Sequence, residues 1–352
     1  MLLVVGSFLP GFDLERYAGG DVAKKFIALG AKVTITSRCR SRLLRFATML
    51  RTVYERRHDY DVALVTVFSG YAFVYAECVS FLLSYLGKPY VLVLHGGNLP
   101  AFANRWPRRT RNLLNRATLV VCPSAYLREA LSHVRSDIQL IPNAVAISGY
   151  SLSSSPPSRG RLLWLRAFHR VYNPVMAPTV LAKVLETMPQ ARLTMVGPDK
   201  GDGSFEATRE TAAELGVLDR IQFTGPIPKE MVAQVTREHD VFLNTTNFDN
   251  TPVSVIEAMA CGLPVVSTNV GGIPYLLEDG VTALLVPPGD AERMAEAVKR
   301  LISEPALAAK LCASGRKLAE SFDWDVVLPQ WLKLFQSMVP DKECARINTA
   351  PP

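Results

Sequence analysis

Short apolar runs alternate with longer stretches of helical periodicity along most of the chain. Such alternation is typical of an α/β protein, in which helices cover both faces of a parallel sheet. In the first half, the runs that predict strands are residues 2–7, 32–36, 62–66, 90–94, 119–122 and 138–141. The pattern restarts in the second half, where the predicted strands are residues 162–165, 193–196, 221–223, 241–244, 264–267 and 283–286.

Helices are predicted between these strands, near residues 20–29, 41–57, 71–86, 104–116, 124–132, 290–303, 305–320 and 324–338. Asn173-Pro174 and Pro228 are each expected to begin a further helix, because proline at the first helical position loses no hydrogen bond. Residues 71–86 are the most hydrophobic of these segments, but they contain Glu77 and are shorter than the ~20 residues of a membrane span. A buried helix is therefore the expectation for them.

A Ser-, Pro- and Gly-rich stretch, residues 148–160, separates the two halves and predicts a linker. At 352 residues the chain is also long for a single core. We therefore expect two doubly wound domains, residues 1–150 and 151–322, and a disordered tail over residues 340–352. Ligands of such sheets bind at the carboxyl ends of the strands, so the loops that follow the strands are expected to line a cleft.

The cysteines and glycines exclude several classes of protein. The six cysteines are scattered with no paired short spacing, so neither a disulfide framework nor a zinc site is indicated, and a reducing cytoplasm is expected. No Gly-x-Gly-x-x-Gly follows the first strand of either half, which disfavours a dehydrogenase. No His cluster with metal-ligand spacing is present, and no metal cofactor is expected.

Positive charge is concentrated in the first half. Residues 1–150 hold 19 lysines and arginines against 9 aspartates and glutamates, whereas the rest of the chain holds 20 against 23. Trp106 is interleaved with the second of two arginine clusters, and such a cluster can associate with an anionic membrane face. A solvated basic surface is the alternative, and nucleic acid is disfavoured because no binding module accompanies the charge. The clusters are Arg38, Arg40, Arg42, Arg45, Arg51, Arg56 and Arg57, then Arg105, Arg108, Arg109, Arg111 and Arg116.

Residues 249–272, DNTPVSVIEAMACGLPVVSTNVGG, carry the most chemical information. Asn250 or Thr251 is expected to cap a helix that starts at Pro252 and ends before Gly262, which suits a left-handed C-terminal position. Asp249 then precedes a helix N-terminus, where free amides and the helix dipole favour an anion such as a diphosphate. Glu257 lies about two turns along the same helix. The carboxylates of Asp249 and Glu257 could therefore accept hydrogen bonds from hydroxyls on either side of the bound anion. A nucleotide-sugar has this arrangement of groups.

This stretch resembles the donor-binding signature of retaining glycosyltransferases of family 4, in which a Glu-x7-Glu pair precedes a Gly-Leu-Pro-Val-Val strand. Several further segments resemble landmarks of the family in the expected order, and together they cover roughly residues 3–335. The resemblance implies the GT-B fold, in which two Rossmann-like domains face each other across a cleft and a C-terminal helix, here residues 323–338, crosses back to the first domain. These segments are Gly19-Gly20, VLHGG (93–97), PSAYLREAL (123–131), IPNAV (141–145), Arg166, MVGPD (195–199), FTGPIP (223–228) and DVFLNTT (240–246).

The resemblance also implies roles for the two carboxylates. Glu257 corresponds to the residue that accepts hydrogen bonds from the ribose of the donor nucleotide, and burial of such a carboxylate requires partners. Asp249 stands where the family has a glutamate that faces the transferred sugar, and it is one methylene shorter. Asn250 and Thr251, with the amides of residues 251–254, are expected to contact the donor.

Arg166 corresponds to the arginine that binds the donor diphosphate and stabilises the leaving group, and a guanidinium suits phosphate oxygens. The family usually has a lysine five or six residues later, where this chain has Val171 and Tyr172. Arg170, His169 and Lys200 are the candidates for the second positive charge, and the sequence does not choose among them.

Four more residues follow from the resemblance. His95 corresponds to a histidine near the donor sugar, and Gly19 and Gly20 to a loop that contacts donor phosphate or acceptor. Gly225 is expected near the base through main-chain contacts. Residues 1–150 would bind the acceptor, and residues 151–322 the donor.

The implied reaction is transfer of a sugar from a nucleotide-sugar to an acceptor hydroxyl, with retention at the anomeric carbon and without a metal. No enzyme nucleophile is evident, and Asp249 is a disfavoured one. A lipid-linked or polysaccharide precursor at the inner membrane face fits the basic surface. The alternatives are a nucleotide-sugar 2-epimerase or hydrolysing relative, and a binding subunit that has lost catalysis. Asp249 and the missing lysine are the features that support the last alternative.

Overall fold

The computed structural model describes residues 1–8, 19–36, 39–152 and 159–338. The chain forms two compact units, one of Met1–Pro142 with Leu328–Pro352 and one of Asn143–Val327. Part of the expected linker, residues 153–158, and the expected tail, residues 340–352, lie outside the described residues.

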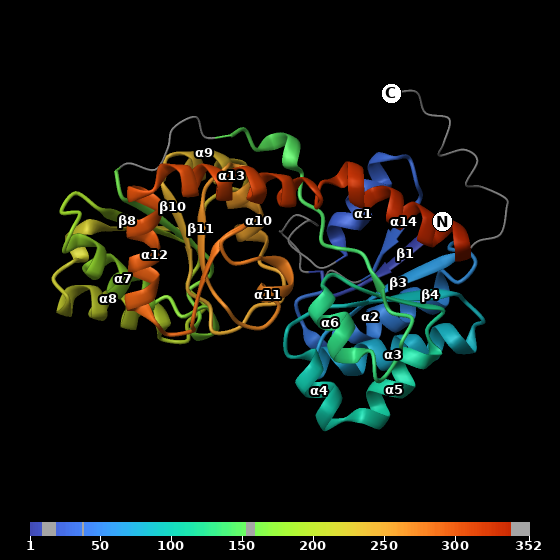
Figure 1. The fold of residues 1–352 in the computed structure, drawn as a ribbon. Coiled ribbons are helices and arrows are strands. Elements are labelled where there is room, and N and C mark those ends of the chain that lie inside the picture. Colours follow the sequence, from blue (N-terminus) through green and yellow to red (C-terminus); the bar gives the residue numbers. More distant parts are fainter. Residues whose placement is uncertain (9–18, 37–38, 153–158, 339–352) are drawn as a thin grey trace. The chain divides into compact units, whose positions relative to one another are not determined.

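The first unit contains a parallel six-stranded sheet (Figure 1). Three of its strands, at residues 2–5, 62–67 and 90–94, are almost fully buried, as expected where helices cover both faces. The strand order is β2-β1-β3-β4-β5-β6, a flavodoxin-like order whose topological switch point lies between β1 and β3. The strands are β1 (Leu2–Val5), β2 (Val33–Ile35), β3 (Val62–Val67), β4 (Tyr90–Leu94), β5 (Leu119–Cys122) and β6 (Gln139–Leu140).

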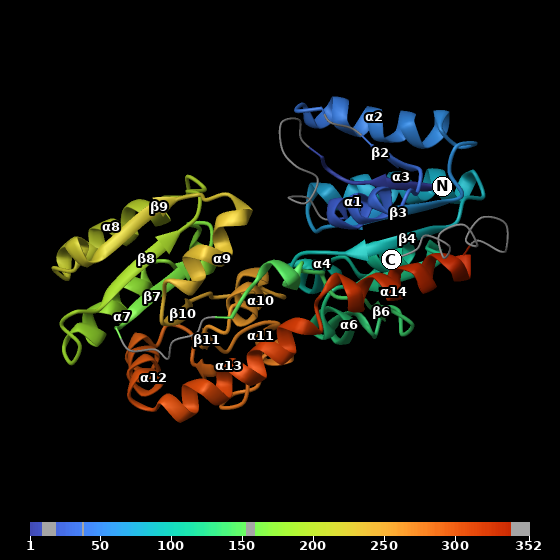
Figure 2. The ribbon, with the colours of Figure 1, turned by 90° about the horizontal axis from the view of Figure 1, so that it is seen from above.

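The second unit contains another parallel six-stranded sheet, of order β12-β11-β10-β7-β8-β9. Counted from its own first strand this is the Rossmann order 3-2-1-4-5-6, and its switch point lies between β7 and β10. Strands β7, β8 and β9 run side by side in Figure 2. The strands are β7 (Arg161–Leu165), β8 (Arg192–Val196), β9 (Ile221–Gly225), β10 (Val241–Asn244), β11 (Val265–Thr268) and β12 (Leu284–Val286). The prediction of two doubly wound α/β sheets is confirmed.

The helices of the first unit agree with the predicted segments except in one place. The single helix predicted over residues 104–116 is wrong, because Trp106 leaves the helical conformation and Pro107 begins a new helix. The helices are α1 (Gly20–Ala28), α2 (Arg42–Glu55), α3 (Tyr71–Tyr85), α4 (Leu99–Arg105), α5 (Pro107–Arg116) and α6 (Ala125–Leu131).

In the second unit, helices cover both faces of the sheet because alternate residues of each strand point to opposite faces. Leu162 and Trp164 of β7 pack in a cluster with α7 and α12, whereas Leu163 packs in the cluster of α9 and α10. The helices are α7 (Met176–Leu185), α8 (Ser204–Glu214), α9 (Lys229–Arg237), α10 (Val253–Ala260), α11 (Ile273–Leu276), α12 (Ala291–Ser303) and α13 (Pro305–Glu320), and α14 (Trp324–Met338) begins in this unit.

Helix starts in this unit differ from their predictions. Pro228 was expected to begin a helix, but α9 begins at Lys229 with Pro228 as its N-cap. Asn173 was expected to cap a helix beginning at Pro174, but α7 begins at Met176. Asn173 has φ 45° and ends the short 3-10 turn Arg170–Tyr172, a left-handed position that asparagine tolerates better than most residues. Pro174 therefore lies in a turn that precedes α7 and is not the first residue of the helix.

Helix α14 has the predicted bounds, and its residues from Leu328 onward belong to the first unit. There the ring of Phe335 meets the ring of Phe26 on α1 edge to face, with 5.2 Å between centroids. Within the part of the chain that the structure describes, no helix combines the length and the apolar character that crossing a membrane requires.

Candidate functional site

The switch point of the second sheet brings two loops together. Strands β7 and β10 are neighbours, so the loop that follows β7 begins beside the loop that follows β10. Arg166 is the first residue after β7, and Asp249 lies in the loop after β10. Ligands of doubly wound sheets bind where neighbouring connections diverge in this way.

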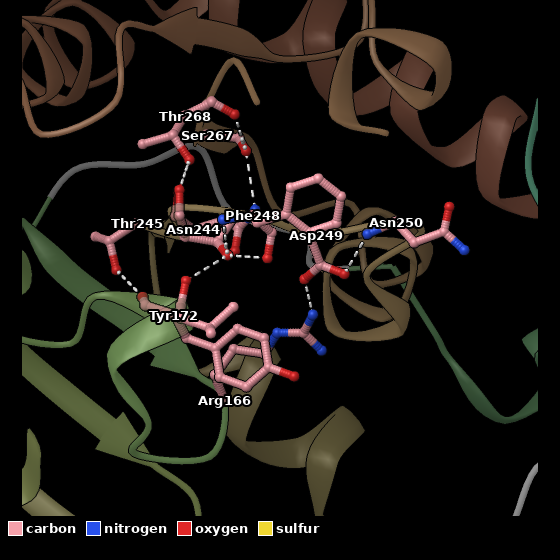
Figure 3. A network of polar contacts seen from close by, with 11 residues as sticks. Arg166, Tyr172, Asn244, Thr245, Phe248, Asp249, Asn250, Ser267 and Thr268 are labelled. Carbon is pink, nitrogen blue, oxygen red and sulfur yellow. Dashed lines mark hydrogen bonds and ion pairs between the residues drawn. The ribbon is translucent and has the colours of Figure 1, made fainter. Parts of the chain in front are cut away.

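Hydrogen bonds tie the two loops to each other (Figure 3). The Thr245 hydroxyl accepts from Trp164 Nε1 at 2.9 Å and donates to the Tyr172 carbonyl at 2.9 Å. The Thr246 hydroxyl and the Asn247 amide both donate to the Val171 carbonyl, at 3.1 and 2.8 Å. These contacts hold the loop that carries Asp249 against the segment that follows Arg166.

The Arg166 guanidinium is held from two sides. Its Nη2 is ion-paired with Asp249 Oδ2, and its Cζ lies 4.4 Å from the centre of the Tyr172 ring (Figure 3). Burial lowers the pKa of Arg166, and Tyr172 and the Glu257 carboxylate partly oppose this effect. The Arg166 Nε is buried and makes no hydrogen bond to a described residue. An arginine with a buried, unpaired donor is suited to receive an anionic oxygen.

Two glycines support the backbone of the Asp249 loop. The Gly272 amide donates to the Asp249 carbonyl at 2.8 Å. A Cβ at Gly272 would lie 2.0 Å from the Asn250 carbonyl oxygen, and one at Gly271 would lie 2.4 Å from the Asp249 carbonyl oxygen. Gly271 also has φ 55°, which side chains disfavour. Glycine is therefore needed at both positions because the backbone here lies against the carbonyls of residues 249 and 250, and not only because the chain turns.

We expect Gly272→Ala to displace the Asp249 loop. The backbone of Gly272 is not in the left-handed region, so the effect would be steric overlap, destabilising the fold by about 1–3 kcal/mol. Gly149→Ala is a matched control, because a Cβ there meets nothing within 4 Å. Urea unfolding and nucleotide-induced thermal shifts would measure both variants. If Gly272→Ala behaved like Gly149→Ala in both, the loop would not depend on this contact.

Helix α10 follows the Asp249 loop and is buried along most of its length. It begins at Val253 with Pro252 as N-cap, so the predicted capping by Asn250 or Thr251 and the start at Pro252 are wrong by one or two residues. Gly262 has φ 72°, which confirms the predicted left-handed end. In the first turn, the Ser254 hydroxyl is buried without a hydrogen-bond partner among the described residues. Sequence reasoning did not single out this serine.

Glu257 is buried and has two partners that sequence reasoning missed. The Tyr150 hydroxyl donates to Glu257 Oε1 at 2.9 Å, and Lys229 Nζ lies 2.9 Å from the same oxygen. Burial raises the pKa of Tyr150, and the neighbouring Glu257 raises it further, so the phenol stays protonated and donates. Tyr150 lies 107 positions before Glu257, so no local pattern signals the contact.

The three candidates for the second positive charge differ in their contacts. The Arg170 guanidinium is directed to Asp202, with Nε 3.3 Å from Oδ2, and the side chain is 76% exposed. His169 Nδ1 accepts from the Val171 amide, and its Nε2 lies 3.8 Å from Asp202. The Lys200 amide donates to the Phe168 carbonyl in the same loop region, and its side chain is exposed. Lys229, which pairs with Glu257, is a fourth candidate, with a side chain 57% exposed.

Gly225 and Gly197 shape the neighbouring loops. Gly225 ends β9 with φ 68°, and its carbonyl accepts from the Gly197 amide at 3.0 Å. A Cβ at Gly197 would lie 1.8 Å from the Arg166 carbonyl oxygen, so only glycine permits this approach.

The remaining predicted residues belong to the first unit. Gly19 precedes α1 with φ 78°, and Gly20 begins the helix. A Cβ at Gly19 would lie 3.1 Å from Cγ2 of Thr66, near the carboxyl end of β3. His95 follows β4 and stacks on Phe68, with 5.2 Å between ring centroids. Burial lowers the pKa of His95 to about 4, so the ring is neutral at pH 7, and its buried Nε2 has no hydrogen-bond partner among the described residues.

A cavity of about 400 Å³ lies elsewhere in the second unit, at the amino ends of β7, β8 and β9. It opens at the opposite edge of the sheet from Arg166, where doubly wound sheets do not bind their principal ligands. No group of three or more His, Cys, Asp or Glu side chains suited to a metal ion occurs within residues 1–8, 19–36, 39–152 and 159–338.

Family models match both halves of the chain. Residues 7–148 match a model described as Glycosyltransferase Family 4, and residues 161–304 match one described as Glycosyl transferases group 1. Among curated proteins, the chain is similar to D-inositol 3-phosphate glycosyltransferase of Mycobacteroides abscessus, with 32% identity over 177 residues, which are 50% of this chain and 40% of the relative. The Rhodococcus opacus protein of the same name is 35% identical over 160 residues, 43% of this chain and 36% of that relative. The chain thus spans well under two thirds of these relatives' length.

Solved structures resemble the whole chain. Sucrose-phosphate synthase from Thermosynechococcus elongatus has a TM-score of 0.78 and 20% identity, covering 96% of this chain and 98% of that one. HepE of Anabaena, solved in complex with UDP and glucose, has a TM-score of 0.76 and 20% identity, covering 96% and 99%. At this level of identity the likeness identifies the fold alone, which is GT-B.

Proposed function

Because the chain belongs to the glycosyl transferases of group 1, in glycosyltransferase family 4, we propose that it transfers a sugar from a nucleotide-diphosphate-sugar to an acceptor hydroxyl. The observation that supports this most strongly is the buried Arg166 Nε at the switch point of the second sheet, which has no hydrogen-bond partner among the described residues. The Ser254 hydroxyl, in the first turn of α10, is a second buried polar group without a partner in the part of the chain that the structure describes. Helix N-termini favour phosphate through their free amides and dipole.

In this proposal the diphosphate binds between Arg166 and the N-terminus of α10. Arg166 would then exchange its contact with Asp249 for phosphate oxygens, and the carboxylate would be free to accept from a hydroxyl of the sugar. Glu257 would accept from the ribose hydroxyls, and the HepE complex with UDP gives a uridine nucleotide as the first donor to test. Lys229 would supply the second positive charge, since Arg170 is directed to Asp202.

The chemical step that we propose retains the anomeric configuration. The bond from the anomeric carbon to the diphosphate oxygen breaks, and the acceptor oxygen attacks the same face of the sugar. The acceptor proton passes to the departing phosphate oxygen, so no enzyme nucleophile is required. Arg166 and the amides of α10 stabilise the negative charge that develops on the leaving group, and they do so without a metal.

The acceptor is proposed to be a polysaccharide or lipid-linked precursor, bound by the first unit at an anionic membrane surface. The excess of basic residues in positions 1–150 favours such a surface. His95, neutral at pH 7, and the loop at Gly19 and Gly20 are the groups of this unit that we expect near the donor sugar or the acceptor.

A thermal-shift screen of the protein with UDP, GDP, ADP and their common sugars tests the donor. A nucleotide at about 100 times its dissociation constant should stabilise the folded protein by about 2.7 kcal/mol. The binding nucleotide-sugar would then be incubated with and without acceptors in EDTA, and the anomeric configuration of the product read by NMR. No shift, or binding without turnover on any acceptor, would support the degenerate subunit. Conversion of the donor without an acceptor would support the epimerase or hydrolase.

A further inference from the structure

Helix α3 exposes large apolar side chains, although a helix of its apolar composition is expected to be buried. Its only charged residue is Glu77, and its inner face packs Phe73, Val79 and Leu83 into the core of the first unit. Helices that are apolar on all sides are normally enclosed. On the outer face, Tyr71, Phe81 and Tyr85 are 82%, 61% and 79% exposed.

The outward-facing residues form one line along the helix, in which Cys78 is half-buried and the others are exposed. Tyr71, Val74, Cys78, Phe81 and Tyr85, which we call the α3 stripe, follow each other at spacings of three and four residues. This spacing places side chains on a single helical face. The stripe is therefore a continuous apolar surface rather than a set of scattered residues, and such surfaces mark sites of interaction.

Helix α5 places arginines beside the stripe. The Arg109 guanidinium donates from both Nε and Nη2 to Glu77 of α3, the Nε bond measuring 3.0 Å, and the Arg116 Cζ lies 5.8 Å from the centre of the Phe81 ring. The segment 99–116 contains no acidic residue. Four of its arginines, Arg105, Arg108, Arg111 and Arg116, are exposed, and we call them the α4–α5 arginines.

We infer that the α3 stripe and the α4–α5 arginines form a docking face for an anionic lipid bilayer. The tyrosine and phenylalanine rings would enter the headgroup region, where amphipathic aromatic side chains are favoured, while the arginines meet lipid phosphates. With 15 residues, α3 would lie in the plane of the interface. A second copy of the chain is disfavoured as the occupant, because a twofold contact would bring arginines against arginines. The inference rests on the proposed association with an anionic membrane and deepens it by naming the face that docks, and it uses no residue of the donor site.

Co-sedimentation of the full chain with vesicles tests this docking face. We expect binding to phosphatidylcholine vesicles that contain phosphatidylglycerol, and little binding to pure phosphatidylcholine. Arg108→Gln with Arg111→Gln should reduce partitioning about 30-fold at low salt. Phe81→Ser with Tyr85→Ser should reduce it about 10-fold or more, because burial of two large rings is lost. Arg209→Gln with Tyr275→Ser, exposed residues of the second unit, is the control and should bind like the unchanged protein.

Fluorescence provides an independent readout, because Trp106 lies within the arginine segment and is 44% exposed. Brominated anionic lipids should quench the protein, and Trp106→Phe should remove this quenching. The inference is overturned if the unchanged protein does not bind the anionic vesicles, or if the stripe and arginine variants bind as the control does. It is also overturned if the stripe variants dissociate a dimer in solution, or lose binding to an acidic protein or nucleic acid while vesicle binding persists. Nucleotide-induced thermal shifts should be unchanged in all these variants, which separates failure of this face from failure of the donor site.

Discussion

Arg166→Gln is expected to lower kcat by about 10²–10³-fold, the effect of removing one preorganised donor to a developing oxyanion. The same change should destabilise the fold by about 3–5 kcal/mol, because it leaves the Asp249 carboxylate buried without its ion-pair partner. Steady-state kinetics with the donor from the thermal-shift screen, together with urea unfolding, would measure the two effects.

The double variant Arg166→Gln, Asp249→Asn separates stability from catalysis. Removing both charges should restore most of the lost stability, since an uncharged pair has no buried charge to compensate. Activity should remain low, because the guanidinium that faces the leaving group is still absent. Arg166→Lys keeps the charge but loses the planar fork and the stacking on Tyr172, and we expect an intermediate kcat.

Arg209→Gln on α8 is the control for this series, since Arg209 is exposed and makes no ion pair with a described residue. It should leave stability within about 0.5 kcal/mol and kcat unchanged. If Arg166→Gln retained kcat within a few-fold while folded, the leaving-group role would be wrong and the catalytically degenerate or epimerase alternatives would gain weight.

Local sequence patterns predicted the layered fold well. Strands buried on both faces appear as continuous apolar runs, and their order along the chain leaves few arrangements once crossovers are right-handed. Glycine and proline act through their own backbone conformations, so their effects can be predicted from the local sequence. The left-handed helix end at Gly262 was predicted in this way, whereas the helix break at Pro107 was missed.

Features that depend on contacts between segments far apart in the sequence could not be predicted from local patterns. The Tyr150 and Lys229 contacts to Glu257 join segments far apart in the sequence. The close approach of Gly272 to Asn250 appears only when β11 and β10 are paired. The exposed face of α3 was predicted to be buried, because composition reports how apolar a helix is but not which of its faces has a neighbour.

Glu257→Ala is expected to weaken nucleotide binding about 100-fold, because charged hydrogen bonds contribute about 1.5–3 kcal/mol each and a ribose offers two hydroxyls. The thermal-shift assay makes this loss visible. At the concentration that stabilises the unchanged protein by about 2.7 kcal/mol, a 100-fold weaker site would stabilise by only about 0.4 kcal/mol. Glu257→Gln keeps the size and tests the charge, and it should lose most of the same affinity.

The partners of Glu257 allow its binding role to be distinguished from a structural one. Glu257→Ala leaves the buried Tyr150 hydroxyl without its acceptor, whereas Glu257→Ala with Tyr150→Phe removes the donor as well. If Glu257 binds ribose, the double variant should regain stability in urea unfolding and still fail to bind nucleotide. Recovery of nucleotide binding together with stability would mean that Glu257 acts only by holding Tyr150. Lys229→Met should leave stability nearly unchanged, because the lysine is largely exposed, and it should lower kcat only if this lysine supplies the second positive charge.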